Sequence, residues 1–525
     1  MPDTTARRAP SAASGQRRRA VGTSALGFGL FLAVNMLSTG GGAFPLLPVE
    51  FQTFGVMLSF YLAQALCLVA TLAAGALVAY RRPRCFARRT TVLCGPVACA
   101  GSLCLIAPLY LPRFAPWLVP VGGALLGVGS ALFMLFWQRL FASRDFAQGM
   151  LGIVLGMACA APLYVLLSAM PSAVAAFVTA LVAIPLAEVL LIGASRTMDL
   201  DQPMFEDEPR AHANVYRHAL GVHWRSALCV GCFAFTGGIA RAVTIEDPRV
   251  GSLVNMASMA GVLVSALALV LLWRRKTLRF NTVLVFRTLF PAVVTAFVAL
   301  PYLGEAYLRA FAGVAYAVFT FGLMILMAQC AQTSHEAGVH PVVLHGCFAG
   351  IVFALQAVGF VVGYLSPHAF ADRALQLTTM ALSSVWVLAL TMYLVRGHLD
   401  PNSPHTRSVE FIALEPASAP EPIPVAPPGA PEGAPRRNAW LGETDANAPY
   451  RDRVSKQCDV LAQRYLLTIR EGEILELIAR GNTVPRMAET LVISENTVKT
   501  YCRRLYAKLG VHKRSEVLDL LEELG

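Results

Sequence analysis

Long apolar stretches dominate the first three quarters of the chain. A helix needs about 20 mostly apolar residues to cross the hydrocarbon core of a bilayer, and helices satisfy their own backbone hydrogen bonds there. The pattern therefore predicts an all-α, polytopic membrane helix bundle. The twelve predicted spans are 22–42, 54–79, 91–111, 116–137, 147–168, 173–194, 226–245, 250–273, 281–301, 306–328, 341–365 and 375–395.

The predicted spans fall into two sets of six. They define a membrane domain over 21–396, with halves at 21–195 and 225–396. The more polar stretch 196–224 separates the halves and is expected to be a cytoplasmic loop. This organisation indicates an internal repeat.

The most basic loop follows the second predicted span in each half, which supports the repeat. Tyr80-Arg-Arg before Thr91-Val-Leu matches Trp273-Arg-Arg before Thr282-Val-Leu. The arrangement resembles the major facilitator superfamily, whose two six-helix halves are parallel repeats. The resemblance is one of architecture, because that family's loop motif has an Asp before its basic residues and Ala79 precedes them here.

Lys and Arg are concentrated in alternate loops, and this bias sets the orientation of a membrane protein. The loops at 80–90 and 273–280 are the most basic, and the run at 17–19 falls on the same side. The intervening loops hold few cations and several acids. The pattern therefore predicts a multi-pass protein of the plasma membrane with cytoplasmic N- and C-termini. Residues 1–20 are expected to form a basic disordered arm.

Ionisable residues are scarce in the predicted spans, although ion-coupled carriers need them at membrane depth. Three ionisable residues lie near span ends, where a charged side chain can reach the membrane interface. They are Glu188, Arg241 and Arg287. The polar residues at mid-span are Asn35, Gln64, Asn255, Gln356 and His345. We therefore expect the bundle to bind an unknown small-molecule signal and change shape, without driving uphill transport.

Composition agrees with a membrane protein, since 56% of the 525 residues are hydrophobic and 14% are charged, against about 25% charged in soluble domains. The net charge of +11 suits the phosphates of nucleic acid or of lipid. The twelve cysteines lie mostly in apolar runs, and we interpret Cys229-x-x-Cys232 as packing. No catalytic residue, metal site or cofactor is predicted, and an enzyme is not expected.

The composition changes abruptly after the last span. Residues 397–455 form a Pro/Ala-rich linker, with the densest proline run between Glu415 and Pro435. Proline lacks an amide hydrogen and fixes φ, so this run is expected to be an extended spacer. The final domain is expected over 456–525.

Four short helices are predicted in this domain. Thr468 and Glu471 form a capping box that starts the first, and Gly481 ends it. The second covers about 484–491. The third covers about 495–508 after the N-cap Ser494, and the fourth covers about 516–523 after Ser515.

The third of these helices has one apolar and one cationic face. Val498, Cys502, Leu505 and Leu509 follow the spacing of a buried helix face. The other face carries Asn496, Thr497, Lys499, Thr500, Arg503 and Arg504. A solvated basic face is the plainer interpretation of the charges alone, but the caps, turn and core spacing favour a helix-turn-helix whose recognition helix enters the major groove.

This domain resembles the LuxR-type helix-turn-helix of bacterial regulators. The resemblance rests on Thr497-Val-Lys499 and on Lys508-Leu-Gly-Val511, which match hallmark strings of that family. It implies base contacts by Lys499, Thr500 and Arg503, and phosphate contacts by Thr497, Arg504 and Lys508. The chain departs from the family at Val484-Pro-Arg-Met487 and at Tyr501, so the contacts of the second helix are not carried over.

The family pairs as homodimers on inverted-repeat promoter sites of double-stranded DNA, often through the last helix. Here that helix is apolar on more than one face, with leucines at 518, 520, 521 and 524. The surplus fits a partner surface or, alternatively, deeper burial inside the domain. The leading hypothesis is a membrane-embedded transcriptional regulator whose bundle senses a signal. The alternative is a membrane transporter carrying a regulatory DNA-binding tail.

Overall fold

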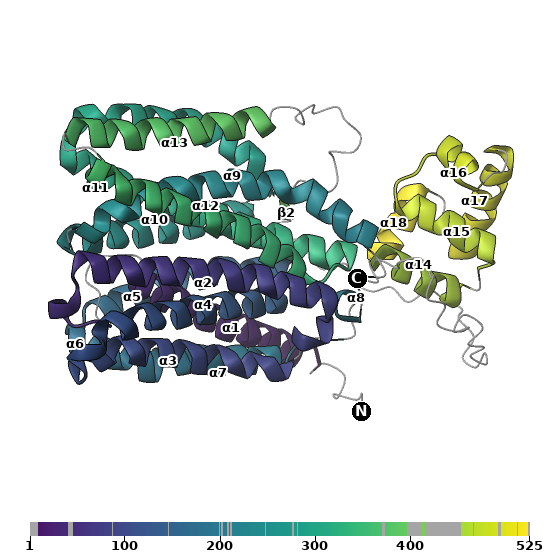
Figure 1. The fold of residues 1–525 in the computed structure, drawn as a ribbon. Coiled ribbons are helices and arrows are strands. Elements are labelled where there is room, and N and C mark those ends of the chain that lie inside the picture. Colours follow the sequence, from purple (N-terminus) through teal and green to yellow (C-terminus); the bar gives the residue numbers. More distant parts are fainter. Residues whose placement is uncertain are drawn as a thin grey trace.

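The computed structural model contains a large helical bundle and a small helical unit at the C-terminus (Figure 1). Everything structural below concerns its described residues, which are 9–39, 46–86, 88–144, 146–198, 200, 203–206, 209–210, 213–246, 248–275, 278–280, 282–369, 373–395, 412–414, 453–465, 467–491, 495–511 and 513–522.

The first half of the bundle contains seven α-helices among the described residues, and α6 and α7 join through a π-helical turn at Thr179–Ala183 into one apolar segment. Short 3-10 turns precede α2, flank α3 and precede α4. The helices are α1 (Ala9–Thr39), α2 (Phe54–Arg81), α3 (Cys94–Ile106), α4 (Ala115–Ala142), α5 (Phe146–Ser168), α6 (Ser172–Val178) and α7 (Ile184–Ser195).

The rest of the chain adds the second half of the bundle and the C-terminal unit. The second half contains α8 (Pro203–Glu206), α9 (Ala213–Glu246), α10 (Pro248–Arg275), β1 (Leu278–Phe280), α11 (Thr282–Ala337), α12 (Pro341–Ala369) and α13 (Arg373–Val395). After β2 (Ile412–Leu414), the C-terminal unit contains α14 (Arg453–Arg464), α15 (Ile469–Ala479), α16 (Val484–Leu491), α17 (Glu495–Leu509) and α18 (Arg514–Glu522).

Ten helices among the described residues are long and apolar enough to cross a membrane. This confirms a multi-pass helical membrane protein, but not the predicted number of twelve. Of the other two predicted spans, 226–245 lies inside α9, and 281–301 lies in the first part of α11, where Phe286–Ala299 is a shorter apolar helix.

The prediction of separate helices at 281–301 and 306–328 was wrong, because α11 is one helix of 56 residues. The intervening sequence around Pro301 and Gly304 is rich in Ala, Leu, Glu and Arg, which are good helix formers. A membrane helix also tolerates Pro. A straight helix of this length would rise about 84 Å, whereas the hydrocarbon core of a bilayer is about 30 Å thick. A straight α11 could therefore have only part of its length in the hydrocarbon core.

Two further boundaries differ from the sequence expectation. Residues 9–20 of the predicted disordered arm are helical and continue into α1. The predicted loop 196–224 contains α8 and the start of α9, which begins at Ala213 instead of at residue 226. In both places an apolar helix continues into a polar segment, since each added residue gains a backbone hydrogen bond once a helix exists.

Equivalent helices of the two halves pack alike, which gives the internal repeat a structural basis. In the first half α1 packs against α5 and α2 against α4. In the second half α9 packs against α12 and α10 against α11. Between the halves, α2 meets α12 and α5 meets α10. The second helix of each half therefore lies against the fifth span of the other, as expected for two halves related by a pseudo-two-fold axis.

Glycines allow the closest of these contacts. A Cβ added to Gly29 in α1 would lie 2.7 Å from the carbonyl oxygen of Gly156 in α5. A Cβ added to Gly238 in α9 would collide with the carbonyl oxygen of Gln356 in α12, and one added to Gly359 would collide with that of Phe235. Small residues let membrane helices approach closely, so the equivalent pairs α1–α5 and α9–α12 are both glycine seams.

The all-α class is confirmed, with one small addition. β1 and β2 pair antiparallel, with Leu278 opposite Leu414 and Phe280 opposite Ile412. β1 belongs to the basic loop after α10, and β2 belongs to the predicted linker. Residues 453–455, at the end of the predicted linker, instead begin α14. The rest of the linker, including the proline run, lies outside the described residues.

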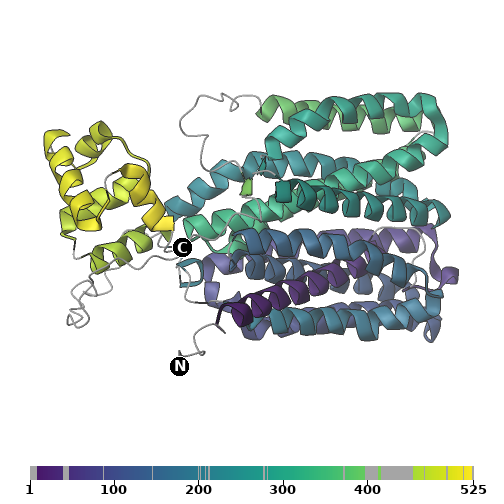
Figure 2. The same cartoon turned by 180° about the vertical axis from the view of Figure 1, so that it is seen from behind.

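The C-terminal unit has a hydrophobic core of its own, formed by side chains from all five of its helices. It lies beyond one end of the bundle, and α1 starts at that same end (Figure 2). The predicted four helices are present as α15 to α18. α14 precedes them and was not predicted; it places Cys458 and Leu461 in the core.

Candidate functional site

The first turn of α15 is fixed by the predicted capping box. The amide of Glu471 donates to Oγ1 of Thr468 at 3.4 Å, and the amide of Thr468 donates to Oε2 of Glu471 at 2.8 Å. Each residue thereby satisfies one of the amides that a helix start leaves without a partner. The box fixes where α15 begins.

The turn from α15 to α16 depends on Gly481, which has φ +81°. Its amide donates to the carbonyl of Ile478, and the amide of Asn482 donates to that of Leu477. This is a Schellman ending, which requires a left-handed residue that glycine adopts at low cost. Gly510, with φ +72°, ends α17 in the same way, since the amide of Val511 donates to the carbonyl of Tyr506. Both helix ends are therefore set by glycine.

α17 presents the two faces that its sequence predicts. Val498 and Leu505 are fully buried, and Cys502 and Leu509 are nearly so. Lys499 and Arg503 are exposed. They lie one helical turn apart on the outer side, so their charges face outward together. α16 packs against α17, as the first helix of a helix-turn-helix does.

Four other predicted DNA contacts are less fully defined. Asn496, Thr497, Thr500 and Arg504 lie in the helical backbone of α17, but their side chains are outside the described residues. The backbone places Thr500 beside Lys499 and Arg504 beside Arg503. The turn residues Val492 to Ser494 also lie outside the described part of the chain.

Lys508, the remaining predicted contact, forms an ion pair within the unit. Its Nζ lies 2.6 Å from Oε2 of Glu471, which is 4% exposed, whereas the Lys508 side chain is 37% exposed. Burial alone raises the pKa of the Glu471 carboxyl, but the hydrogen bonds from Lys508 and Thr468 outweigh burial and lower that pKa below its ordinary value. The carboxylate therefore stays ionised, and it ties the end of α17 to the start of α15.

Arg514 shows how a cation of this unit can be structural. Its guanidinium donates to the carbonyl of Ile478 at 3.0 Å and to that of Asn482 at 2.9 Å. These carbonyls lie at the end of α15 and in the turn that follows it, where cations are favoured. Arg514 thereby joins the start of α18 to the end of α15.

Arg486 is an exposed cation that sequence reasoning did not single out. It lies in α16, where Met487 and Ala488 are buried. The segment Val484-Pro-Arg-Met487 departs from the family pattern, which is why no contact was assigned to it. The sequence signal that could have identified Arg486 is its place directly before the apolar pair Met487 and Ala488 in a short predicted helix.

α18 is a core helix of the unit. Val517 is fully buried and Leu521 nearly so, while Leu518 and Leu520 are partly buried against the same core. α18 packs against α14 and α15. The sequence left two interpretations of its apolar surplus open, and burial inside the unit accounts for these four side chains; Leu524 lies outside the described residues.

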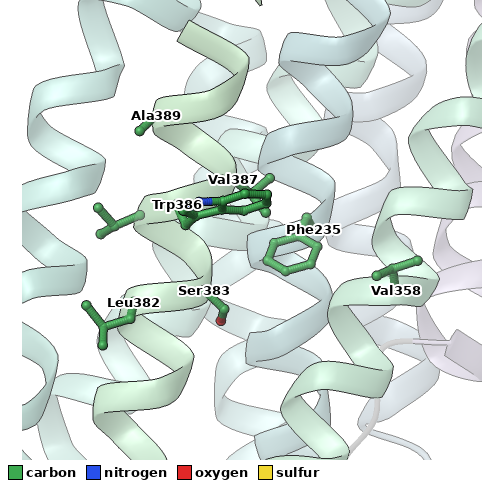
Figure 3. A pocket seen from close by; sticks show the side chains of 8 residues that line it. Phe235, Val358, Leu382, Ser383, Trp386, Val387 and Ala389 are labelled. Atoms are coloured by element: carbon green, nitrogen blue, oxygen red, sulfur yellow. The ribbon is translucent and has the colours of Figure 1, made fainter. Parts of the chain in front are cut away.

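One groove on the described part of the bundle is open and apolar. It has a volume of about 730 Å³ and lies between α9, α12 and α13, with Trp386, Phe235 and Val358 on its walls (Figure 3). Trp386 is 65% exposed. An open apolar groove at membrane depth suits the acyl chains of lipid, which carry no specific recognition. Within the described residues we find no cluster of His, Cys, Asp or Glu that could hold a metal.

Comparison with known proteins concerns mainly the C-terminal unit. Residues 465–521 match the family described as bacterial regulatory proteins of the luxR family. The chain is 40% identical over 60 residues to the spore germination protein GerE of Bacillus subtilis, which covers 11% of this chain and 81% of GerE. It is 38% identical over 80 residues to the uncharacterized response regulatory protein YgeK of Escherichia coli, covering 14% of this chain and 54% of YgeK.

The chain thus spans about half the length of YgeK. Among solved structures, the bundle is similar to the Escherichia coli fucose:proton symporter FucP, with a TM-score of 0.49 and 12% identity over 71% of this chain and 98% of that one. That likeness is too weak to support a conclusion. The match to GerE covers most of a complete relative, and with the helix-turn-helix geometry it shows that the chain belongs to the luxR family of bacterial regulatory proteins.

Proposed function

We propose that this protein is a membrane-embedded transcriptional regulator. In this account the bundle senses a signal, and the C-terminal unit binds promoter DNA. The observation that carries the proposal is the exposed pair Lys499 and Arg503 on α17 of a luxR-family unit, in one polypeptide with ten helices apolar enough to span a membrane. Cations on a recognition helix are suited to the acceptors of guanine and to phosphates.

In the proposed complex α17 lies in the major groove. Lys499, Thr500 and Arg503 contact base edges from its outer face. Beside them on α17 are Asn496, Thr497 and Arg504. Of these, Thr497 and Arg504 contact backbone phosphates. Arg503 is the strongest candidate for specificity, because a guanidinium can bridge O6 and N7 of one guanine.

Two further cations have different proposed roles. Arg486 on α16 is exposed and suited to the backbone phosphate beside the groove, since the first helix of the motif crosses the backbone. Lys508 is 37% exposed, so it can reach a phosphate only by sharing its ammonium with Glu471. We therefore assign Lys508 mainly to holding α17 in place.

The proposed topology places both termini in the cytoplasm of a cell whose plasma membrane holds the bundle. The excess of Lys and Arg in alternate loops supports this orientation. The C-terminal unit and the start of α1 lie at the same end of the bundle (Figure 2), as an even number of spans requires. The DNA-binding face is then in the compartment of the chromosome.

The proposed signal acts through the pairing of C-terminal units. We expect homodimers on inverted-repeat promoter sites, because two units held in one membrane complex have a high effective concentration for each other. A bundle that changes its own association would then change DNA occupancy without transmitting strain through the long linker.

A transporter with a regulatory DNA-binding tail is the second candidate. It is favoured by one observation: a cavity with polar walls lies between the two halves of the bundle, lined by α1 and α2 on one side and by α9, α11 and α12 on the other. Uptake of a labelled substrate into vesicles against its gradient would establish this function.

The test of the regulator uses residues 453–525 alone. This unit has its own core, and GerE consists mostly of the equivalent sequence, so it should fold by itself. Selection from random duplexes should enrich a defined half-site. The double variant Lys499→Ala, Arg503→Ala should lose this binding, and Lys513→Ala, which removes another exposed cation, should keep the site preference. Absence of any enriched sequence would contradict the proposal.

A further inference from the structure

A cavity of about 50 Å³ lies where the two halves of the bundle meet. Its polar walls include the side-chain amides of Asn35, Gln64 and Gln356, which the sequence identified as polar residues at mid-span. The structure brings all three together, although they come from α1, α2 and α12. Scattered polar residues inside a membrane are costly, so their convergence on one cavity indicates a binding site.

Arg241 lies in the wall of this cavity. Its guanidinium carbon lies 4.4 Å from the ring centroid of Tyr61 and 5.8 Å from that of Phe360. Arg241 therefore packs against α2 and α12 inside the bundle, and the expectation that it sits at an interface was wrong.

The charge of the cavity is one-sided. Its lining residues include one cation, two phenols and three amides, and none carries a carboxylate. The faces of Tyr61 and Phe360 lie against this cation and stabilise it. An anion that enters the cavity would meet one cation and no carboxylate among the lining residues, so it would be attracted to Arg241.

Gln64 provides an independent indication. The residue is 2% exposed, and its amide nitrogen Nε2 is buried with no hydrogen-bond acceptor among the described residues. A buried donor without an acceptor is costly. A ligand with an acceptor oxygen would satisfy it from the same cavity that Arg241 lines.

We propose that Arg241 and Gln64 bind the carboxylate of a small organic acid. The planar guanidinium matches a carboxylate in two parallel hydrogen bonds, and Gln64 donates a third. The aromatic faces of Tyr61, Phe353 and Phe360 surround the short apolar part of the acid. The volume limits the ligand to a few non-hydrogen atoms unless the halves move apart.

Only the identification of the bound acid as the signal rests on the proposed sensing function; the binding site itself does not. Because the cavity is lined by both halves, an acid bound there would contact α2 and α9 at once, so it would favour one relative position of the halves. A ligand can shift a conformational equilibrium only by such a difference in contacts. The structure thus points to a small carboxylate as the class of signal.

The test measures thermal unfolding of the full chain in lipid nanodiscs at constant ionic strength. The probes are acetate and benzoate, with acetamide and benzamide as uncharged matches and chloride as a simple anion. We expect at least one acid to raise the unfolding midpoint in a saturable manner, while its amide and chloride do not. Equal shifts with the amides or with chloride, or no shift with either acid, would overturn the proposal.

Variants assign the effect to the site. Arg241→Gln should weaken acid binding at least about tenfold, the equivalent of about 1.4 kcal/mol, and Arg241→Lys should weaken it less. Arg225→Gln is the matched control, since Arg225 also lies on α9 and stacks on Trp224 at 5.2 Å outside the cavity. Should Arg241→Gln not fold, Gln64→Leu serves instead and should also weaken binding. Unchanged binding in these variants would refute the assignment.

Promoter occupancy separates this inference from the proposed function. If an acid binds through Arg241 without changing occupancy, the site stands and the sensing function fails. If occupancy responds to some other class of molecule equally in the wild type and in Arg241→Gln, the sensing function stands and the site assignment fails.

Discussion

Nζ of Lys508 lies 2.6 Å from Oε2 of Glu471, so the end of the proposed recognition helix is joined to the start of α15. The same oxygen accepts the amide of Thr468. One carboxylate therefore completes a helix cap and also positions α17. In the proposed complex, this connection holds Lys499 and Arg503 in their orientation toward DNA.

Glu471→Ala should destabilise the isolated C-terminal unit by about 1–2 kcal/mol, the typical cost of losing a cap. Urea unfolding followed by circular dichroism measures this loss. Glu473→Ala is the matched control: Glu473 forms a surface pair with Arg470 at 2.8 Å, and such pairs contribute about 0–1 kcal/mol. Equal losses in the two variants would show that Glu471 has no special role.

Acid should destabilise the C-terminal unit through the same carboxyl. The pKa of Glu471 is lowered in the folded state, after the hydrogen bonds from Lys508 and Thr468 outweigh burial. A lowered folded pKa gives stability that is complete above the unfolded pKa of about 4.3 and is lost as pH falls through the folded value. The stability difference between wild type and Glu471→Gln should therefore shrink on acidification below that pH. A difference that is constant with pH would contradict this linkage.

Arg503→Ala should relax the base preference at one position of the half-site and cost about 1–3 kcal/mol, as the loss of a bidentate guanine contact does. We assign Lys513, an exposed cation beyond the end of α17, to a backbone phosphate. Lys513→Ala should therefore weaken binding to all sequences alike, because a phosphate contact carries no sequence information. Binding measured on a set of single-base variants of the site distinguishes the two. If Arg503→Ala keeps the base preference at every position, Arg503 makes no base-specific contact.

Gly238→Ala should destabilise the bundle by about 1–3 kcal/mol, the usual cost of overpacking. The added methyl would collide with the backbone of α12 at Gln356. Gly221→Ala, in the same helix, meets nothing within 4 Å and should be neutral or slightly stabilising. Thermal unfolding in detergent compares them, and an equally stable Gly238→Ala would argue against a close seam between α9 and α12.

Much of the fold follows from periodicity along the chain. The apolar stretches predict the membrane helices, and the spacing of Val498, Cys502, Leu505 and Leu509 predicts the buried face of α17. The continuity of α11 was missed, because Pro301 and Gly304 indicate a break in water, whereas a membrane helix tolerates both residues. α14 was missed because the sequence after the proline-rich run has no strong helix start signal.

The sites were predictable to different degrees. Lys499 and Arg503 could be found because a single helix carries both, so spacing alone places them together. The cavity around Arg241 could not, since Tyr61, Gln64 and Gln356 lie far from it in the chain and only helix packing unites them. Lys508 was assigned to phosphate by the family resemblance, and the sequence does not show its partner Glu471.

The central claim is that the C-terminal unit binds DNA while the helical bundle of the same chain is embedded in a membrane. The most direct measurement is promoter occupancy, by cross-linking and immunoprecipitation, of the full-length protein recovered from the membrane fraction of living cells. We predict discrete enriched sites that share the half-site selected in vitro and that disappear in the Lys499→Ala, Arg503→Ala variant. No enrichment, or the same sites in that variant, would contradict the account.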